Sequence, residues 1–329
     1  QGSWTGMSVV DRLDSDPKHV IVSSNERRAF RNDFYKMNIF TGKKNLMAIG
    51  FVPKNAKGDR VYGTYRDQEG YPIATLVDES LDRVIYTYDK GTKEWSEHIR
   101  FTCQQPSFTP LAATDKGWLV TGSKFSPTGE LVEYNDTNAL YLYDPETREF
   151  SEKLYQDPNY DVGGFTGTCR NASGGAGVDY DTRKLLFVTY EAQEPVKIYF
   201  DDEIAEIYNG LDAVFPNEWV SVVTRDKDRN KMVIRVSSPS NPGDYYFYNR
   251  EQAQLIPLYT YAPWIDRKVM ADTIPVKYTA RDGLVIPAYL TLTKKKTDKN
   301  YMIVLPHGGP NTKQRIGFDW WTQFFANKG

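Results

Sequence analysis

The stretch LYLYDPETREF, residues 140–150, decides the fold class of this chain. A tyrosine-rich alternating run leads to Asp144, a few polar residues follow, and a second apolar position comes at Phe150. Alternation with a period of two is typical of a half-buried β-strand. An Asp side chain can start a turn by accepting a hydrogen bond from the backbone two residues further on. The stretch therefore predicts a β-hairpin whose turn begins at Asp144.

The same pattern occurs four more times. The other stretches are YKMNIFTGKKNLM from Tyr35, VIYTYDKGTKEW from Val84, KIYFDDEIAEIY from Lys197 and YYFYNREQAQLIPL from Tyr245. The turn residues are Asn38, Asp89, Asp144, Asp201 and Asn249, at steps of 51, 55, 57 and 48 residues, and three of the five have Thr three positions later.

A repeat of this length holds four strands of ~6 residues with their turns, which is one blade of a β-propeller. Strand-like runs at 117–122, 184–190 and 219–223 lie where other strands of the blades are expected. The pattern favours a mainly β fold built of four-stranded blades, and a β-sandwich with evenly spaced hairpins is the alternative. Five hairpins end near residue 260, so a larger ring would need chain before Gln1.

Composition agrees with a β-rich globular protein. Aromatic residues make up 14% of the chain, and such side chains are enriched in strands. The formal charge is −2, so no basic surplus favours nucleic acid as a partner. No apolar run approaches the ~18 residues of a membrane helix. We expect a soluble protein without a membrane span; no signal peptide is visible at Gln1, and the compartment and oligomeric state stay open.

Few residues indicate a metal or a cofactor. Cys103 and Cys169 lack the CxxC spacing of a metal or redox site, and whether they pair stays open. His19 and His98 are expected to be ordinary surface or blade residues. The glycine-rich stretch 163–177 has no strand–GxGxxG–helix context, so we expect an irregular loop between blades rather than a phosphate site. We expect no cofactor and no metal.

The pattern changes after Pro263. Alternating runs at 275–280 and 284–292 flank Arg281-Asp282-Gly283, a strong hairpin signal. After a solvated lysine-rich loop at 294–300, a compact buried strand is expected at 301–305, followed by His307-Gly308-Gly309-Pro310. Phe318, Trp321, Phe324 and Phe325 then predict an amphipathic helix that ends at Lys328-Gly329. We therefore expect a propeller domain over 1–263 and the first part of a second domain over 264–329.

A strand, a His-Gly-Gly loop and a helix form the context of the oxyanion loop of α/β-hydrolases. Acyl transfer develops negative charge on the carbonyl oxygen, and fixed N–H groups aimed at that oxygen lower the barrier, by ~3–4 kcal/mol per donor. Glycine lets the backbone approach the substrate closely. His307, Gly308 and Gly309 are therefore candidate site residues, although Gly-Gly-Pro taken alone is also an ordinary turn.

Three segments resemble the junction between propeller and catalytic domain in the prolyl oligopeptidase family of serine peptidases, in its acylaminoacyl-peptidase-like and dipeptidyl-peptidase-like branch. They are PVKYTARDGLVIPAYLTL from Pro275, YMIVLPHGGP from Tyr301 and FDWWTQFFANKG from Phe318. The resemblance is specific over 272–329 and looser over 8–261, where it includes GVDYDTRKLLFVTYE from Gly177.

The resemblance implies a propeller that caps an α/β-hydrolase domain and restricts entry to short peptides, which a Ser-Asp-His triad hydrolyses. It implies that Gly309 offers its backbone N–H to the oxyanion, with His307 and Gly308 shaping the loop. Arg170 is a candidate to meet a substrate carboxylate in the central channel. Asn25-Glu26-Arg27-Arg28 is a candidate to bind a peptide amino terminus, with a solvated turn as the favoured interpretation.

The chain contains no GxSxG. The nearest stretch, residues 171–175 (NASGG), lacks the first glycine and precedes the oxyanion strand, whereas in this fold the nucleophile follows the oxyanion loop. We therefore expect the triad beyond Gly329 and no activity in this chain alone. Two other functions stay open, a peptide- or protein-binding propeller with a degenerate hydrolase remnant and an esterase of the same fold. Cleavage preference is not determined.

Overall fold

The computed structural model describes residues 5–13, 16–29, 31–55, 59–102, 105–163, 165–166, 170–171, 174–179, 181–295, 301–308 and 313–329. Cys103, Cys169, Gly309 and Pro310 lie outside these residues, as do Gly164 and Gly167. The chain divides into two compact units, Gln1–Glu191 and Ala192–Gly329.

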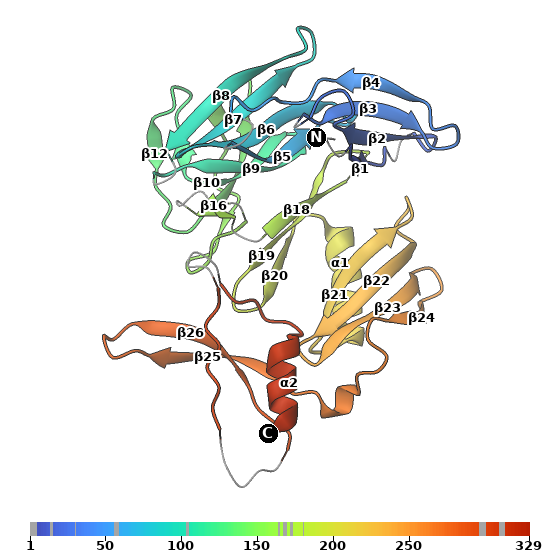
Figure 1. Cartoon of the computed structure of the whole chain (residues 1–329), viewed down its shortest axis with the longest axis vertical. Helices are drawn as coiled ribbons and strands as arrows, with labels where there is room; N and C mark the ends of the chain where they lie inside the picture. The colour runs from blue at the N-terminus through green and yellow to red at the C-terminus, as the bar shows by residue number, and fades with distance from the viewer. Residues whose placement is uncertain are drawn as a thin grey trace. The chain divides into compact units, whose positions relative to one another are not determined.

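Unit 1 is a series of antiparallel sheets (Figure 1). The first sheet contains β1 (Met7–Asp11), β2 (His19–Ser24), β3 (Asp33–Asn38) and β4 (Lys44–Ala48). The second contains β5 (Arg60–Arg66), β6 (Pro72–Glu79), β7 (Asp82–Asp89) and β8 (Glu94–Thr102). In both sheets each strand pairs with the next strand in the sequence, which is the topology of a propeller blade.

The rest of unit 1 continues this plan. The third sheet contains β9 (Phe108–Thr114), β10 (Gly117–Gly122), β13 (Ala139–Asp144), β14 (Glu149–Phe150) and β15 (Tyr155–Gln156). Short pairs are formed by β11 (Lys124–Phe125) with β12 (Leu131–Glu133) and by β16 (Phe165–Thr166) with β17 (Arg170–Asn171). A further sheet begins with β18 (Gly174–Val178) and β19 (Leu185–Glu191). The expected blades and the strands at 117–122 and 184–190 are confirmed.

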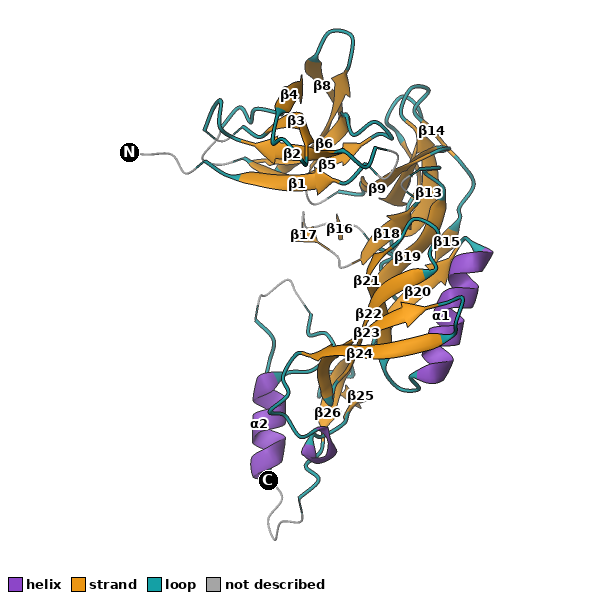
Figure 2. Cartoon of the chain, turned by 90° about the vertical axis from the view of Figure 1, so that its right-hand side faces the viewer, coloured by secondary structure: helices purple, strands orange, loops and turns teal. Residues whose placement is uncertain are grey.

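Unit 2 combines one complete blade with other elements (Figure 2). It begins with β20 (Pro195–Tyr199) and α1 (Asp202–Val214). The blade contains β21 (Trp219–Arg225), β22 (Lys231–Ser238), β23 (Asn241–Asn249) and β24 (Gln254–Thr260). It is followed by η1 (Arg267–Val269), β25 (Thr273–Thr279), β26 (Val285–Thr291) and α2 (Trp320–Lys328). The expected domain boundary at 263 falls between β24 and η1.

Aromatic side chains fill the core between the second and third sheets. Phe101, Phe108, Trp118 and Tyr143 are buried in one cluster. The Phe108 ring lies with its centroid 5.0 Å from that of Tyr143 and 5.1 Å from that of Phe150. Aromatic pairs at such separations add packing energy beyond the area they bury. The high aromatic content of the sequence therefore serves the blade core.

The expected turn residues act as predicted in four of the five hairpins. The Asp89 carboxylate accepts hydrogen bonds from the backbone N–H groups of Gly91 at 2.7 Å and Thr92 at 2.8 Å. Asn38, Asp144 and Asn249 also accept a bond from the backbone N–H three residues further on. The fourth residue after each turn residue has a positive φ, at Gly42, Lys93, Arg148 and Ala253. One turn conformation therefore recurs from blade to blade.

The fifth expected hairpin, at Asp201, is wrong. The Asp201 side chain accepts a hydrogen bond from the Ile204 N–H at 3.0 Å and caps the N-terminus of α1. The turn that recurs here is at Asp179, which accepts from the N–H groups of Asp181 at 3.1 Å and Thr182 at 2.9 Å. After Asp201, apolar residues repeat at helical spacing, and α1 buries Ile204, Ile207, Tyr208 and Leu211. Packing of this face therefore favours the helix.

The glycine-rich stretch is not a loop throughout. Gly174, Gly175 and Gly177 lie in β18, contrary to the expected irregular loop over 163–177. A Cβ atom on Gly177 would lie 2.3 Å from a ring carbon of Phe187, so only glycine lets the strand pass this ring. Gly174 and Gly177 therefore allow close packing between strands, whereas Gly175 has room for a Cβ.

Candidate functional site

The hairpin that precedes the expected oxyanion loop forms as predicted. Strands β25 and β26 pair antiparallel from Thr273–Thr291 to Thr279–Val285. Asp282 accepts a hydrogen bond from the Leu284 N–H at 3.1 Å, and Gly283 has a φ of +88°. The Tyr289 hydroxyl donates to the Gln193 carbonyl at 2.7 Å, which ties the hairpin to the start of unit 2.

The buried strand expected at 301–305 is wrong. These residues form no strand, and all five side chains are exposed, with Met302 84% and Val304 73% exposed. A strand needs a neighbour to receive its backbone hydrogen bonds, and among the described residues none pairs with this segment. The apolar sequence is present, but the sheet that would bury it is not formed by the described chain.

The candidate residues His307 and Gly308 lie next, in exposed irregular backbone. The Nδ1 atom of His307 lies 2.7 Å from the Gly308 carbonyl oxygen. No heavy atom lies within 4 Å of the position a Cβ would take on Gly308. The third candidate, Gly309, lies outside the described residues, so its N–H stays a prediction from the sequence.

The helix expected after the loop is present as α2. Asp319 caps it by accepting a hydrogen bond from the Thr322 N–H at 2.8 Å. Of the four aromatic side chains in the predicted amphipathic pattern, Trp321 is 69% and Phe324 55% exposed, and Phe318 and Phe325 are half-buried. The buried residue of α2 is instead Gln323, which sequence reasoning missed. A glutamine between aromatic residues gives no hydrophobic signal, so the pattern alone could not identify it.

A second feature of interest is a cavity within unit 1 of about 330 Å³. The first strands of four sheets line it, β1, β5, β9 and β18. Its charged side chains are Asp11, Arg66 and Arg183. The Asp11 carboxylate lies 3.7 Å from Arg66 Nε and 3.8 Å from an Arg183 terminal nitrogen. Two guanidinium groups therefore share one buried carboxylate.

The guanidinium groups also hold neighbouring strands together. Arg66 donates to the carbonyls of Val10 at 2.6 Å and Thr64 at 3.1 Å. Arg183 donates to the Asp67 carbonyl at 2.5 Å and occupies the positive-φ position of the Asp179 turn. The sequence reasoning missed all three charged residues. The pattern Asp-x-x-Thr-Arg, shared by the turns of Asp144 and Asp179, could have located Arg183.

The other charged candidates of unit 1 are accounted for in part. Arg170 lies in β17, and its side chain is not among those described. The stretch at 25–28 forms a turn, as favoured, and the Glu26 carboxylate pairs with Lys44 Nζ. That pairing lowers the pKa of Glu26. A carboxylate already paired in this way is a weak candidate for binding a peptide amino terminus.

The two other histidines have structural surroundings. His19 Nδ1 lies 2.9 Å from the Asp16 carboxylate. His98 Nε2 lies 2.7 Å from the Tyr143 hydroxyl, and burial lowers the pKa of His98 to about 4. Both are blade residues, as expected. Within the described ranges, no three His, Cys, Asp or Glu side chains lie close enough to hold a metal ion.

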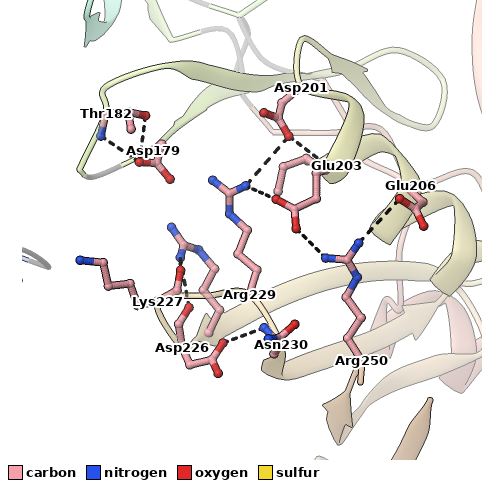
Figure 3. Close-up of polar contacts among 12 residues, drawn as sticks. Asp179, Thr182, Asp201, Glu203, Glu206, Asp226, Lys227, Arg229, Asn230 and Arg250 are labelled. Carbon is pink, nitrogen blue, oxygen red and sulfur yellow. Dashed lines mark hydrogen bonds and ion pairs between the residues drawn. The ribbon is translucent and has the colours of Figure 1, made fainter. Parts of the chain in front are cut away.

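A charged network in unit 2 joins α1 to the blade (Figure 3). Glu203 near the start of α1 accepts hydrogen bonds from Arg229 at 2.7 Å and from Arg250 at 2.5 Å. Arg229 lies in the β21–β22 turn and Arg250 follows β23. The Arg250 and Arg229 guanidinium groups lower the pKa of Glu203. The acidic first turn of α1 therefore binds the β21–β22 turn and the β23–β24 turn of the same blade.

The blades, the β25–β26 hairpin, the His307-Gly308 segment and α2 follow one another in the order that the resemblance to the prolyl oligopeptidase family implies, and sequence comparison supports that resemblance. The chain is 24% identical over 324 residues to dipeptidyl aminopeptidase BIII of Pseudoxanthomonas mexicana, covering 95% of this chain and 43% of that protein. It is 25% identical over 263 residues to dipeptidyl peptidase family member 6 of Caenorhabditis elegans, covering 71% of this chain and 32% of that protein. The chain thus spans less than half the length of these curated relatives.

Among solved structures, prolyl oligopeptidase B of Galerina marginata superimposes with a TM-score of 0.49 at 10% identity, covering 88% of this chain and 39% of that one. The dipeptidyl peptidase 4 of Porphyromonas gingivalis gives a TM-score of 0.47 at 13% identity, covering 95% and 41%. No profile of a known protein family matches the chain. No helix among the described residues is long and apolar enough to cross a membrane.

Proposed function

We propose that this chain carries the propeller and the oxyanion loop of a serine peptidase that hydrolyses short peptides. The observation that carries the proposal is the likeness to a dipeptidyl aminopeptidase over 324 residues, which includes nearly the whole chain. The sequence His307-Gly308-Gly309 between the β25–β26 hairpin and α2 supports it. In this proposal residues 1–263 are the propeller domain and 264–329 begin the hydrolase domain.

In the proposed reaction a serine hydroxyl attacks the peptide carbonyl, and histidine takes its proton. The carbonyl oxygen becomes an oxyanion, the amine leaves with a proton from the histidine, and water then hydrolyses the acyl-enzyme. The backbone N–H of Gly309 stabilises the oxyanion. This hydrogen bond is strongest in the transition state, where the negative charge develops on the oxygen. We propose that the serine, the aspartate and the histidine of the triad lie C-terminal to Gly329, because no GxSxG occurs in this sequence.

The exposed segment 301–305 supports the same proposal. Five consecutive apolar side chains, from Tyr301 at 72% exposure to Leu305 at 52%, are exposed directly before the loop. A continuous apolar run of this length is typical of a strand in a parallel sheet whose two faces are both covered. We propose that further strands of a hydrolase sheet cover it in the longer protein.

The first experiment compares this 329-residue chain with the protein extended beyond Gly329. The extended protein is expected to react with a fluorophosphonate and to cleave dipeptidyl or aminoacyl arylamides, whereas this chain does neither. Labelling of the 329-residue chain would show that the nucleophile lies within it. Failure of the extended protein to label or cleave would favour a binding propeller, and cleavage of esters but not arylamides would favour an esterase.

The second experiment tests the oxyanion donor in the extended protein. Gly309→Pro removes the backbone N–H and is expected to lower kcat by about 10²- to 10³-fold with little change in KM. Gly309→Ala keeps the N–H and serves as the matched control. Equal losses in both variants would assign the effect to the loop conformation and contradict the role of the N–H.

A further inference from the structure

The buried face of α2 contains an amide in place of an apolar side chain. Gln323 is 4% exposed, whereas Trp320, Trp321 and Phe324 are 49%, 69% and 55% exposed. Burial of an amide is unfavourable unless its polar atoms find partners. The position of Gln323 therefore calls for an explanation in terms of hydrogen bonds.

All the polar atoms of the Gln323 side chain are bonded. Its Oε1 accepts from the Ala271 N–H at 2.9 Å, and its Nε2 donates to the Ala271 carbonyl at 2.7 Å. The same Nε2 donates to the Pro239 carbonyl at 2.8 Å. Ala271 is 2% exposed, and one side chain thus satisfies both its backbone N–H and its backbone carbonyl, as a neighbouring strand would.

The three bonds connect parts of unit 2 that are distant in sequence. Pro239 lies in the turn between β22 and β23, in the complete blade. Ala271 lies between η1 and β25, at the start of the segment that resembles a hydrolase domain. Apolar contacts are not directional, but a bidentate amide fixes the distance and the rotation of α2 about its axis.

Resting on the proposed function, we infer that Gln323 is a positioning residue for the oxyanion loop. It fixes α2, whose first residue follows Gly309 by 11 positions, against the blade and the base of the β25–β26 hairpin. Between Gly309 and α2 in the sequence lies Ile316, whose side chain is 8% exposed and anchors the connecting segment. Only ten residues, 310–319, separate Gly309 from α2, so a loosened α2 is expected to misplace the loop N–H.

The test has one arm that does not depend on activity. In the 329-residue chain, Gln323→Met keeps the length of the side chain but removes all three bonds. Hydrogen exchange at the Ala271 amide and in α2 is expected to accelerate about 30-fold, as for the loss of ~2 kcal/mol of local stability. Amides of β22 in the blade of unit 2 should be unchanged, which shows that unit 2 of the variant folds. Gln314→Met, at an exposed glutamine, is the matched control and should change nothing.

The second arm uses the extended protein and peptide arylamides. Gln323→Met is expected to lower kcat about 10-fold or more with KM within about threefold, because a misplaced donor weakens transition-state binding alone. Gln323→Glu, which sets a carboxylate against two carbonyl oxygens, should lose kcat in the same way. The ratio of its kcat to that of the unsubstituted protein at the same pH should rise as the pH is lowered toward 5, where a protonated carboxyl donates one bond.

The outcomes separate the claims. Unchanged exchange at Ala271 in Gln323→Met overturns the docking role of Gln323. Accelerated exchange with unchanged kcat overturns the positioning role and leaves Gln323 as a structural contact. Absence of hydrolysis by the unsubstituted extended protein overturns the proposed function, and with it the positioning role, whereas the exchange arm still decides whether Gln323 docks α2.

Discussion

The carboxylate of Glu203 lies 2.7 Å from the guanidinium group of Arg229, which joins the first turn of α1 to the β21–β22 turn. The same carboxylate reaches Arg250 through its other oxygen. Arg229 is 13% and Arg250 27% exposed, so both cations lose much of their hydration and depend on this partner more than surface residues do. The helix is therefore held to the blade by charge as well as by its apolar face.

Replacement of Glu203 should loosen α1 selectively. Glu203→Gln is expected to cost about 1 kcal/mol of local stability, a modest value because the Glu203 side chain is 42% exposed. Hydrogen exchange in α1 should accelerate, and less so at 1 M salt, where the wild-type pair is already screened. Glu206→Gln is the control, since Glu206 is 78% exposed and lies 3.6 Å from Arg250. Equal effects of the two variants would contradict the central role of Glu203.

The turn chemistry can be tested at Asp144. Its carboxylate accepts hydrogen bonds from the N–H groups of Glu146 and Thr147, and the Glu146 bond is the main cause of the lowered pKa of Asp144. Asp144→Asn keeps a carbonyl acceptor and should preserve slow exchange in β13 and β14, whereas Asp144→Ala should accelerate it. A turn that is equally stable with Asn and Ala would show that the side-chain acceptor is dispensable.

His98 should make stability depend on pH. Burial holds the pKa of His98 at about 4 in the folded chain, below its ordinary value of 6.5. As the pH falls from about 6.5 toward 4, the unfolded chain takes up this proton first, so stability that is present above pH 6.5 is lost. Between pH 7 and pH 4.5 the loss from this residue should be about 2 to 3 kcal/mol. Urea unfolding of His98→Gln should show a weaker pH dependence than the wild type, and an identical dependence would refute the assignment.

The close approach of β18 to β19 predicts a steric effect. Gly177→Ala would place a Cβ 2.3 Å from the Phe187 ring and should destabilise the sheet by ~1–3 kcal/mol. Gly175→Ala is the matched control, because its nearest neighbour would be Thr189 Oγ1 at 3.9 Å. The double variant Gly177→Ala/Phe187→Leu should recover part of the loss in thermal unfolding. If Gly177→Ala and Gly175→Ala unfold at the same temperature, the Phe187 ring does not constrain position 177.

Local chemistry explains what the sequence determined. The turns at Asn38, Asp89 and Asp144 depend on a side-chain acceptor and backbone donors two or three residues away, so their sequence pattern is sufficient to predict them. The same holds for the β25–β26 hairpin, whose Asp282-Gly283 turn supplies both an acceptor and a positive φ. The blade repeat, and from it the fold class, could be predicted because such interactions are short in sequence.

Tertiary packing decided the remainder. Asp201 has the same side-chain chemistry as Asp144, yet it caps a helix because Ile204, Ile207 and Leu211 bury one face of that helix. The segment 301–305 is apolar enough for a strand, but a strand forms only where a neighbour accepts its backbone hydrogen bonds. Gln323 and Ala271 are 52 residues apart in the sequence, and Asp11 and Arg183 come from opposite ends of the sequence of unit 1 although their side chains lie 3.8 Å apart. Contacts over such separations depend on how sheets and helices pack, which no local pattern of residues specifies.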